Sequence, residues 1–415
     1  MAGLPSLEES YSTICSEMGL LRNPYIMEKL RLTDKDAAQT SSDVGVTVKI
    51  PGNTPIVPVP RVTDSDIVAV AQAVNNTFVT GLDLRFNQLT DLGAQHLANL
   101  LKETVALRYL NLMCNDIGPQ GAEMIAKALH RNDTLKRLQL TGNKIGNIGA
   151  MSLASMLQIN NCLEDLDVSD CDVDTQSLVA FATVLTWNKS LRIINLNRPL
   201  LFSQQEETTV HMAQMLKMNQ HLIELHLGKH DMKDFGVERL SEALTFNFTL
   251  RYLDLRCNKI TRDGAKCLSE YLKNNRPLEI LDLASNRIED DGAIYLSEAI
   301  SLFNTNLKAL TITSNNITGK GLVALAEAMK INSSLSYIYI WGNKLDELTC
   351  VAFSEMISCG RLPEEHTDVS PYVVDGQVYL AELSHGLRKH YYWTPSFGPD
   401  GDPAANSALA LSAGM

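Results

Sequence analysis

Few side chains of this chain could do chemistry, and the histidines are the first to consider. His226 and His230 lie in one short region, where an imidazole could act as a general base or bind a metal. No nucleophile accompanies them, so we interpret both as surface polar residues. The sequence also lacks the motifs G-x-x-x-x-G-K-S/T, H-E-x-x-H and G-x-S-x-G, and it has no EF-hand loop. We therefore expect no catalytic residue, no cofactor and no metal site.

Cysteine is the second residue type that could carry chemistry. No two cysteines form a CxxC pair, and no histidine cluster completes a zinc site. We expect reduced, buried thiols that act as small apolar side chains. The eight cysteines are Cys15, Cys114, Cys162, Cys171, Cys257, Cys267, Cys350 and Cys359.

The composition limits the classes of partner. Of the 415 residues, 45% are apolar and 20% are charged, which is typical of a soluble protein. The net charge of -12 argues against a broad surface that follows the phosphates of a nucleic acid. No apolar run could span a bilayer, and residues 1–18 lack a signal-peptide pattern, so we expect an intracellular protein that binds no membrane.

The elements that must position any functional residue come from one repeated pattern, L-x-L-x-x-N. Ten copies are spaced 28, 28, 28, 28, 31, 28, 28, 29 and 28 residues apart. A glycine stands six residues after the last position in seven copies, and an asparagine stands seventeen residues after it in six copies. The last positions are Asn87, Asn115, Asn143, Cys171, Pro199, His230, Asn258, Asn286, Asn315 and Asn343.

Each part of the repeat predicts one structural element. The L-x-L segment is typical of a short strand with alternate apolar side chains facing inward. The asparagine side chain can bond backbone groups of adjacent turns, and the glycine permits a tight entry into the next element. Segments such as GAEMIAKALHRN then carry apolar residues at helical spacing. Each repeat is therefore one strand and one helix, which bury their apolar faces only by stacking on neighbouring repeats.

This pattern resembles the leucine-rich repeat family, in its long ribonuclease-inhibitor-like form, over residues 61–360. The resemblance implies an α/β solenoid of about ten 28-residue repeats. Strands stack about 4.8 Å apart, whereas helices need about 8–10 Å, so such an array must curve. We expect a horseshoe with a parallel sheet on the concave face and helices on the convex face.

The segments that flank the array predict two caps and a tail. Residues 1–60 contain a helical segment, with a capping box at Ser6 and Glu9, and then an extended, proline-rich linker or edge strand. In residues 361–394, Asp375-Gly376 between two β-prone runs predicts a two-residue hairpin turn. We expect the hairpin to pair with the last strand of the array and to seal the sheet edge. Residues 395–415 are rich in small residues and proline and are expected to be disordered.

The repeat is broken between residues 198 and 207, which read RPLLFSQQEE. Pro199 takes the asparagine position and has no backbone N–H, and three extra residues follow, so we expect this turn to open. The insertion is either a tolerated loop or a recognition loop. Its candidate partner-binding residues are Phe202, Gln204 and Glu206.

The outward-facing strand positions provide the other candidate partner-binding residues. Alternate strand side chains point away from the core, so these positions line the predicted concave face. Acidic residues recur in the middle of the array, and three aromatic residues line up in its last strand. We expect Tyr339 and Trp341 to stay accessible, because aromatic anchors often dominate binding. The candidates are Asp165, Asp167, Glu224, Asp254, Asp282, Tyr337, Tyr339 and Trp341.

The leading functional hypothesis is a non-enzymatic scaffold that binds protein partners. Three segments outside the repeat consensus resemble one group within the family: NLNRPLLFSQQEETTVHMAQMLK, IYIWGNKLDE and VVDGQVYLAELSHGLRKHYYW. That resemblance implies a structural component of radial spokes in the axoneme of motile cilia, with other axonemal proteins as partners. The alternative that it implies is a nucleolar or cytoplasmic regulatory factor of the ribosome-biogenesis type. Neither role involves a small-molecule substrate.

Two less favoured hypotheses come from other proteins with long repeats. A GTPase-activating protein would need a catalytic arginine, for which Arg85 is the candidate. A nuclease inhibitor would place an acidic surface against a basic enzyme. The predicted inner face has few clustered Trp and Glu residues, which weakens the inhibitor hypothesis.

Overall fold

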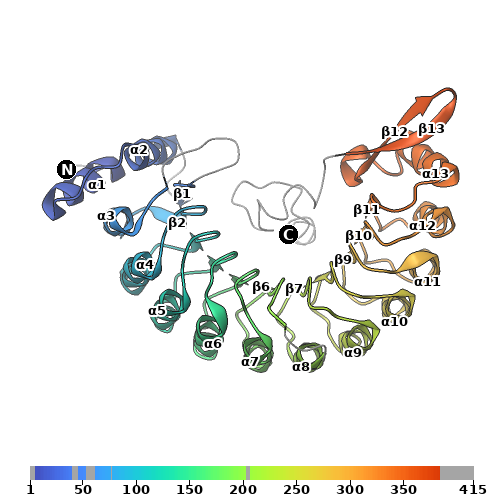
Figure 1. Ribbon diagram of the computed structural model, residues 1–415, viewed down its shortest axis with the longest axis horizontal. Helices are drawn as coiled ribbons and strands as arrows, with labels where there is room; N and C mark the ends of the chain where they lie inside the picture. Colours follow the sequence, from blue (N-terminus) through green and yellow to red (C-terminus); the bar gives the residue numbers. More distant parts are fainter. Residues whose placement is uncertain (1–4, 40–44, 53–60, 76, 202–205, 384–415) are drawn as a thin grey trace. The chain divides into compact units, whose positions relative to one another are not determined.

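The structure is a computed structural model that describes residues 5–39, 45–52, 61–75, 77–201 and 206–383. The chain divides into two compact units, Met1–Phe202 and Ser203–Met415. In each unit the helices lie on one side of a parallel sheet, as Figure 1 shows. The predicted α/β leucine-rich-repeat fold is confirmed, with one strand and one helix in each repeat.

The first unit begins with two helices and a strand that precede the repeats. Its six described strands are parallel and follow the order of the chain, from β1 to β6. The elements are α1 (Leu7–Met18), α2 (Pro24–Gln39), β1 (Val46–Lys49), α3 (Asp64–Val74), β2 (Val79–Asp83), α4 (Asp91–Glu103), β3 (Tyr109–Asn111), α5 (Pro119–Leu129), β4 (Arg137–Gln139), α6 (Gly146–Leu157), β5 (Asp165–Asp167), α7 (Thr175–Leu185) and β6 (Ile193–Asn195).

The second unit continues the alternation of helix and strand and ends in a hairpin. Its strands β7 to β11 are also parallel and in chain order. The elements are α8 (Glu207–Met218), β7 (Glu224–His226), α9 (Asp234–Leu244), β8 (Tyr252–Asp254), α10 (Arg262–Lys273), β9 (Ile280–Asp282), α11 (Glu289–Leu302), β10 (Ala309–Thr311), α12 (Gly319–Ile331), β11 (Tyr337–Tyr339), α13 (Glu347–Ser358), η1 (Glu364–His366), β12 (Val369–Val374) and β13 (Gln377–Glu382).

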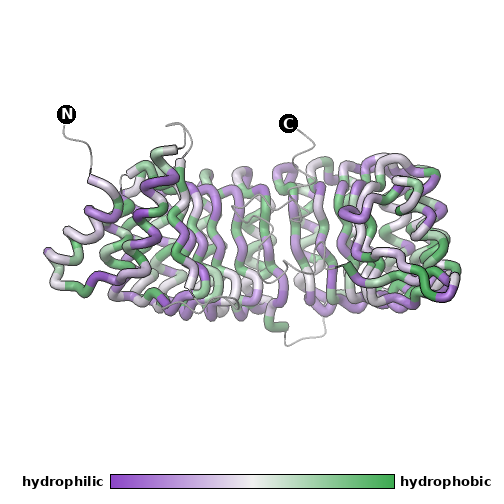
Figure 2. The backbone as a smooth tube through the Cα atoms, turned by 90° about the horizontal axis from the view of Figure 1, so that it is seen from above, coloured by the Kyte–Doolittle hydropathy of each residue, from purple (hydrophilic) through white to green (hydrophobic). Residues whose placement is uncertain are grey.

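The strand register equals the length of the repeat, so like residues stack on like. Leu110 pairs with Leu138 and Leu138 with Leu166, each 28 residues further along. These leucines are fully buried beneath the helices. Figure 2 shows the result on the tube, where apolar stretches recur from repeat to repeat. Stacking of this kind supplies the core that one repeat cannot form alone.

The asparagine at the end of L-x-L-x-x-N bonds two repeats together, as predicted. Asn258 Nδ2 donates to the carbonyl oxygens of Leu227 and Leu255 at 3.0 and 2.9 Å, and its Oδ1 accepts from the backbone N–H groups of His230 and Met232 at 2.9 and 3.1 Å. The side chain thus satisfies four backbone groups that the strands leave open. Similar bonds are made by Asn87, Asn115, Asn143, Asn286, Asn315 and Asn343.

A second asparagine ladder runs along the helix ends. Asn247 Nδ2 donates to the carbonyl oxygens of Leu216 and Asn219 at 2.9 and 2.8 Å, and its Oδ1 accepts from the N–H groups of Thr249 and Leu250 at 3.0 and 2.8 Å. Four ladder residues head N-x-S/T sequences, but their amides are buried and bonded, so they serve the fold and not glycosylation. These four are Asn132, Asn188, Asn247 and Asn332.

The turn at Pro199 does not open, contrary to the prediction. Arg198 has a φ of 59°, the left-handed conformation that Cys114 and Cys257 adopt at the same place in intact repeats. Leu200 N donates to the carbonyl oxygen of Val173 at 2.8 Å. The equivalent bond in an intact repeat runs from Lys259 N to the carbonyl oxygen of Met232, also at 2.8 Å. The left-handed residue and this backbone bond keep the turn in its usual form although Pro199 has no N–H. The three extra residues are therefore accommodated after Leu201.

The N-terminal end of the array is covered by residues of the first 60. The predicted capping box is present, with Glu9 N bonded to Ser6 Oγ at 3.2 Å and Ser6 N to Glu9 Oε2 at 3.0 Å. Strand β1 pairs in parallel with β2, so the extended segment contains an edge strand, with Val48 opposite Leu82. Residues 53–60 lie outside the described ranges.

The C-terminal end of the array is closed differently from the prediction. The predicted hairpin exists, with Val374 paired to Gln377 across the turn at Asp375 and Gly376. It forms a separate two-stranded sheet that packs on α13, and it does not pair with β11. Residues just before the hairpin cap β11 instead, as described below. The predicted disordered tail, residues 395–415, lies outside the described residues.

Candidate functional site

The acidic residues predicted on the strands are buried, each at most 1% exposed. Asp165 and Asp167 belong to β5 of the first unit. Asp167 Oδ1 accepts from Ser169 N at 2.9 Å and from Ser169 Oγ at 2.6 Å, and Asn195 Nδ2 donates to Asp167 Oδ2 at 3.0 Å. These contacts hold the strand ends in place. A direct contact between these carboxylates and a partner stays a prediction.

In the second unit the outward residues of β7, β8 and β9 form a buried charge cluster. His226 lies between two carboxylates, with Nδ1 3.3 Å from Asp254 Oδ2 and Nε2 3.4 Å from Glu224 Oε2. Arg256 Nε is 2.8 Å from both oxygens of Asp254 and 3.3 Å from Asp282 Oδ2. The cluster joins three of the predicted acidic residues, Glu224, Asp254 and Asp282, through one imidazole and one guanidinium. Each of the three carboxylates thus has a cation beside it, which a buried charge requires.

The histidines are not surface residues, so that prediction is wrong. His226 is 2% exposed and His230 is 5% exposed. Burial lowers the pKa of His226, but the hydrogen bonds that the imidazole donates to Asp254 and Glu224 outweigh this effect and raise the pKa to about 9. The imidazole therefore carries a positive charge at neutral pH. It is a structural cation and is unsuited to act as a general base.

The two aspartates of the cluster shift in opposite directions. Burial alone would raise the pKa of Asp254, but the guanidinium of Arg256 and the imidazole of His226 hold it well below its ordinary value. For Asp282, burial dominates and raises the pKa to about 6, because Arg256 is committed mainly to Asp254. The negative charge of Asp282 is therefore stabilised less than that of Asp254.

The aromatic residues of β11 are covered by the segment that follows α13. Ile340 N and Trp341 N donate to the carboxylate of Asp368 at 2.8 and 3.0 Å, and the ring of Tyr337 stacks on that of His366 at 3.9 Å. Asp368 thus seals the edge that the hairpin was predicted to seal.

The expected accessibility of this aromatic strip is only partly observed. Tyr339 is 4% exposed, so the prediction that it stays accessible is wrong. Tyr337 and Trp341 are half-buried. In the hairpin, Tyr372 and Tyr379 stack on each other at 5.6 Å and are 48% and 40% exposed, and Trp393 lies outside the described residues.

Glu206, predicted to bind a partner, makes a structural contact. Its Oε1 accepts from the backbone N–H of Lys233 at 2.6 Å. Asp234 does the same one repeat later and accepts from Thr261 N, Thr261 Oγ1 and Gly264 N at 2.8, 2.7 and 3.0 Å. Each acid caps the N-terminus of the next helix, where N–H groups lack partners. Phe202 and Gln204 lie outside the described residues.

The structure also shows a feature that the sequence interpretation missed. The residue just before each second-ladder asparagine is often a large apolar side chain, and it is exposed. Because the asparagine turns inward to bond the preceding repeat, its neighbour is left facing solvent. The exposed fractions are 58% for Ile159 and 74% for Trp187 in the first unit, and 51% for Met218, 57% for Phe246, 50% for Phe303 and 67% for Ile331 in the second.

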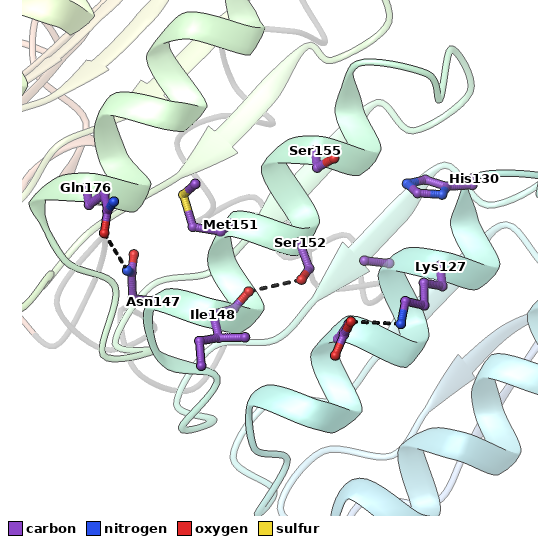
Figure 3. Close-up of a pocket in the computed structure, with 10 residues that line it drawn as sticks. Lys127, His130, Asn147, Ile148, Met151, Ser152, Ser155 and Gln176 are labelled. Carbon is purple, nitrogen blue, oxygen red and sulfur yellow. Dashed lines mark hydrogen bonds and ion pairs between the residues drawn. The ribbon is translucent and has the colours of Figure 1, made fainter.

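The outer side of the first unit carries a groove between α5 and α6, shown in Figure 3. Its volume is about 530 Å³. Ile148 and Met151 form apolar walls, while Lys127 is held by Glu123 at 2.7 Å. Within the described part of the chain, His130 Nε2 is buried without a hydrogen-bond partner.

The remaining candidates for chemistry are placed in the fold as follows. Arg85, the candidate catalytic arginine, pairs with Asp83 at 3.3 Å, and its side chain is 15% exposed. All eight cysteines are free thiols, but only four are buried, so the predicted burial is wrong for Cys114, Cys257, Cys267 and Cys359. Across the described ranges, no helix is long and apolar enough to cross a membrane, and no group of three or more His, Cys, Asp or Glu residues could hold a metal ion.

Comparison with known proteins identifies the family. The leucine-rich repeat model matches residues 75–98, 107–126, 131–154, 160–182, 246–269, 274–297 and 303–326. Leucine-rich repeat-containing protein 34 of Homo sapiens is 57% identical over 98% of this chain and 87% of its own length. The proteins of the same name from Rattus norvegicus and Mus musculus are 55% and 49% identical, over 98% of both chains in each case. Together with the paired strands and asparagine ladders, these matches show that the chain belongs to the leucine-rich repeat-containing protein 34 family of leucine-rich repeat proteins.

Proposed function

We propose that this chain is a non-enzymatic scaffold of the radial spokes of motile cilia, held in the axoneme by contacts with other proteins. The observation that supports the scaffold function is the exposed apolar residue just before the second-ladder asparagine, which recurs in several repeats. Exposed apolar side chains mark a protein-binding site when they are contiguous, and the pair Phe246 and Phe248 stands on one loop. The resemblance of the non-repeat segments to one group of the family supports the ciliary assignment.

The polar residues of the strands fit a scaffold better than an enzyme. His226, Arg256 and their carboxylates compensate one another's charges in the interior, and the other predicted acids are buried as well. Groups that are fixed in this way rigidify the surface that they support. Each unit can therefore present several separated contact sites to large partners.

Localisation and loss of function in multiciliated cells test the proposal. The full chain would carry a small epitope tag, and axonemes would be extracted with increasing salt. We expect the chain to stay with the axoneme and to be released together with radial-spoke proteins. In cells that lack the chain, we expect electron tomography to show spokes with missing density. Nucleolar staining, normal spokes and altered ribosome precursors would instead support the nucleolar role.

A further inference from the structure

Two phenylalanines stand exposed in the loop just after α9, on either side of a buried asparagine. Asn247 is 1% exposed because it belongs to the second ladder, while Phe246 and Phe248 are 57% and 60% exposed. The inward direction of the asparagine forces its neighbours outward. The pair therefore presents two large apolar surfaces to solvent, an unfavourable arrangement unless another molecule covers them.

One side chain fixes the backbone at both phenylalanines. Gln220 Nε2 donates to the carbonyl oxygen of Phe246 at 3.1 Å, and Phe248 N donates to Gln220 Oε1 at 3.0 Å. Asn247 adds bonds to Leu216 and Asn219 in the preceding repeat. The loop is thus held in one conformation before anything binds, which reduces the entropy lost on association.

Each ring has a cation beside it. Lys217 Nζ lies 5.3 Å from the centroid of Phe246, and Arg276 Cζ lies 4.5 Å from that of Phe248. The described residues provide neither cation with a carboxylate partner, whereas Lys273 nearby pairs with Glu270 at 2.7 Å. Arg276 Nε is also buried without a hydrogen-bond acceptor. A guanidinium N–H in that position calls for an oxygen acceptor.

We propose that Lys217, Phe246, Phe248 and Arg276 form a docking site for a partner protein segment in which apolar side chains lie next to Asp or Glu. The apolar side chains would cover the two rings, and the carboxylates would accept hydrogen bonds from Arg276 and Lys217. We call these four residues the Phe246–Phe248 site. The inference rests on the scaffold function proposed above and specifies the chemistry of one of its partners.

Charge favours a peptide over a nucleic acid as the ligand. Aromatic rings beside cations also suit single-stranded nucleic acids, whose bases stack and whose phosphates attract cations. The chain carries a net charge of -12, however, which repels a long polyanion. A short acidic segment places only a few negative charges, directly at Lys217 and Arg276. Its binding should weaken as salt increases, because these charges lie at the surface.

Fluorescence polarisation with the full chain tests the site. The probes are labelled peptide pools of equal length with four compositions: acidic–apolar, basic–apolar, uncharged–apolar and acidic–polar. We expect the acidic–apolar pool to bind at least about tenfold more tightly than the others. Phe248→Ala should weaken that binding by about tenfold or more, as truncation of an aromatic anchor does. The double variant Lys217→Glu and Arg276→Glu should instead prefer the basic–apolar pool.

Matched control variants distinguish binding at this site from nonspecific binding to exposed apolar or charged residues. Leu348→Ala removes an exposed apolar side chain that does not precede a ladder asparagine, and Lys266→Glu reverses another exposed charge on α10. We expect both to bind the acidic–apolar pool as the unchanged chain does. Unaltered thermal melting would show that the Phe248→Ala and charge-reversed chains are folded.

Several outcomes would overturn the proposal. Equal affinities for all pools, no measurable binding, or binding that survives Phe248→Ala would each do so. So would tighter binding of a single-stranded oligonucleotide, or self-association of the chain that Phe248→Ala abolishes. If spokes contain the chain but no peptide binds, this inference fails alone. If peptides bind but spokes lack the chain, only the ciliary assignment fails.

Discussion

Cys171 takes the place of a ladder asparagine, and its Sγ lies 3.0 Å from the carbonyl oxygen of Leu140. An intact ladder residue such as Asn143 donates from its amide nitrogen to two carbonyls and accepts a bond from Ile117 N. A thiol is a weak donor and a weak acceptor, so it replaces only part of this bonding. Burial raises the pKa of Cys171 well above its ordinary value, so the thiol stays protonated and can still donate.

Restoring the asparagine should therefore stabilise the first unit. We expect Cys171→Asn to raise the free energy of unfolding by about 1 kcal/mol, because at least one strong hydrogen bond replaces a weak one. Urea unfolding followed by circular dichroism would measure this. Cys171→Ala provides the comparison and should lower stability. A destabilised Cys171→Asn chain would show that the turn has adapted to the shape of the thiol.

Removing an intact ladder residue should have the opposite effect. Asn258→Ala leaves four buried backbone groups without partners, so we expect it to lower the free energy of unfolding by roughly 1–3 kcal/mol. Pro199→Ala should change stability far less, because the proline side chain makes no such bonds and the turn is already formed. Equal shifts in melting temperature for the two variants would contradict the ladder's energetic role.

The repeats were predictable from sequence because their bonding is local and periodic. An asparagine at Asn115 bonds groups within its own turn and in the turn one repeat before, so the spacing alone identifies both partners. The same applies to the hairpin, where Asp375 and Gly376 have the positive φ values that a two-residue turn requires.

The burial and ion pairing of the outward-facing strand residues were not predictable in the same way. The repeat spacing places Asp254 beside His226 on the next strand, but it does not show that Glu224 and Asp254 enclose the imidazole and that the group is buried. The cap provides a similar example. Asp368 closes β11 because the chain after α13 passes the sheet edge before the hairpin begins, a path that no local pattern encodes. Each of these misses involves side-chain burial or a chain path that the repeat pattern does not encode.

The charge cluster should make stability depend on pH in the alkaline range. The pKa of His226 is raised from 6.5 to about 9, so the folded chain holds this proton more tightly than the unfolded chain. Its stabilising contribution is complete below pH 6.5 and is lost as the pH rises through about 9. We expect unfolding midpoints in urea to fall between pH 7 and pH 9.5, and His226→Gln to reduce that fall.

His211→Gln is the control for this experiment, because its ring is exposed and lies 4.0 Å from Glu207. We expect it to leave the pH dependence unchanged. If His226→Gln preserves the full alkaline loss of stability, the imidazole is not a buried cation in the folded chain.

Glu206 and Asp234 both accept hydrogen bonds at the N-terminus of the next helix, and they differ in the number of bonds that they accept. Asp234→Ala removes three hydrogen bonds to the next repeat, and Glu206→Ala removes the bond to Lys233 N. Because N-cap losses amount to about 0.5–2 kcal/mol, we expect both variants to lower the free energy of unfolding, and Asp234→Ala to have the larger effect. Glu206→Gln keeps an acceptor and should lose less than Glu206→Ala. If Glu206→Ala leaves unfolding unchanged but reduces recovery of radial-spoke proteins with the tagged chain, Glu206 acts in partner binding and its contact with Lys233 is incidental.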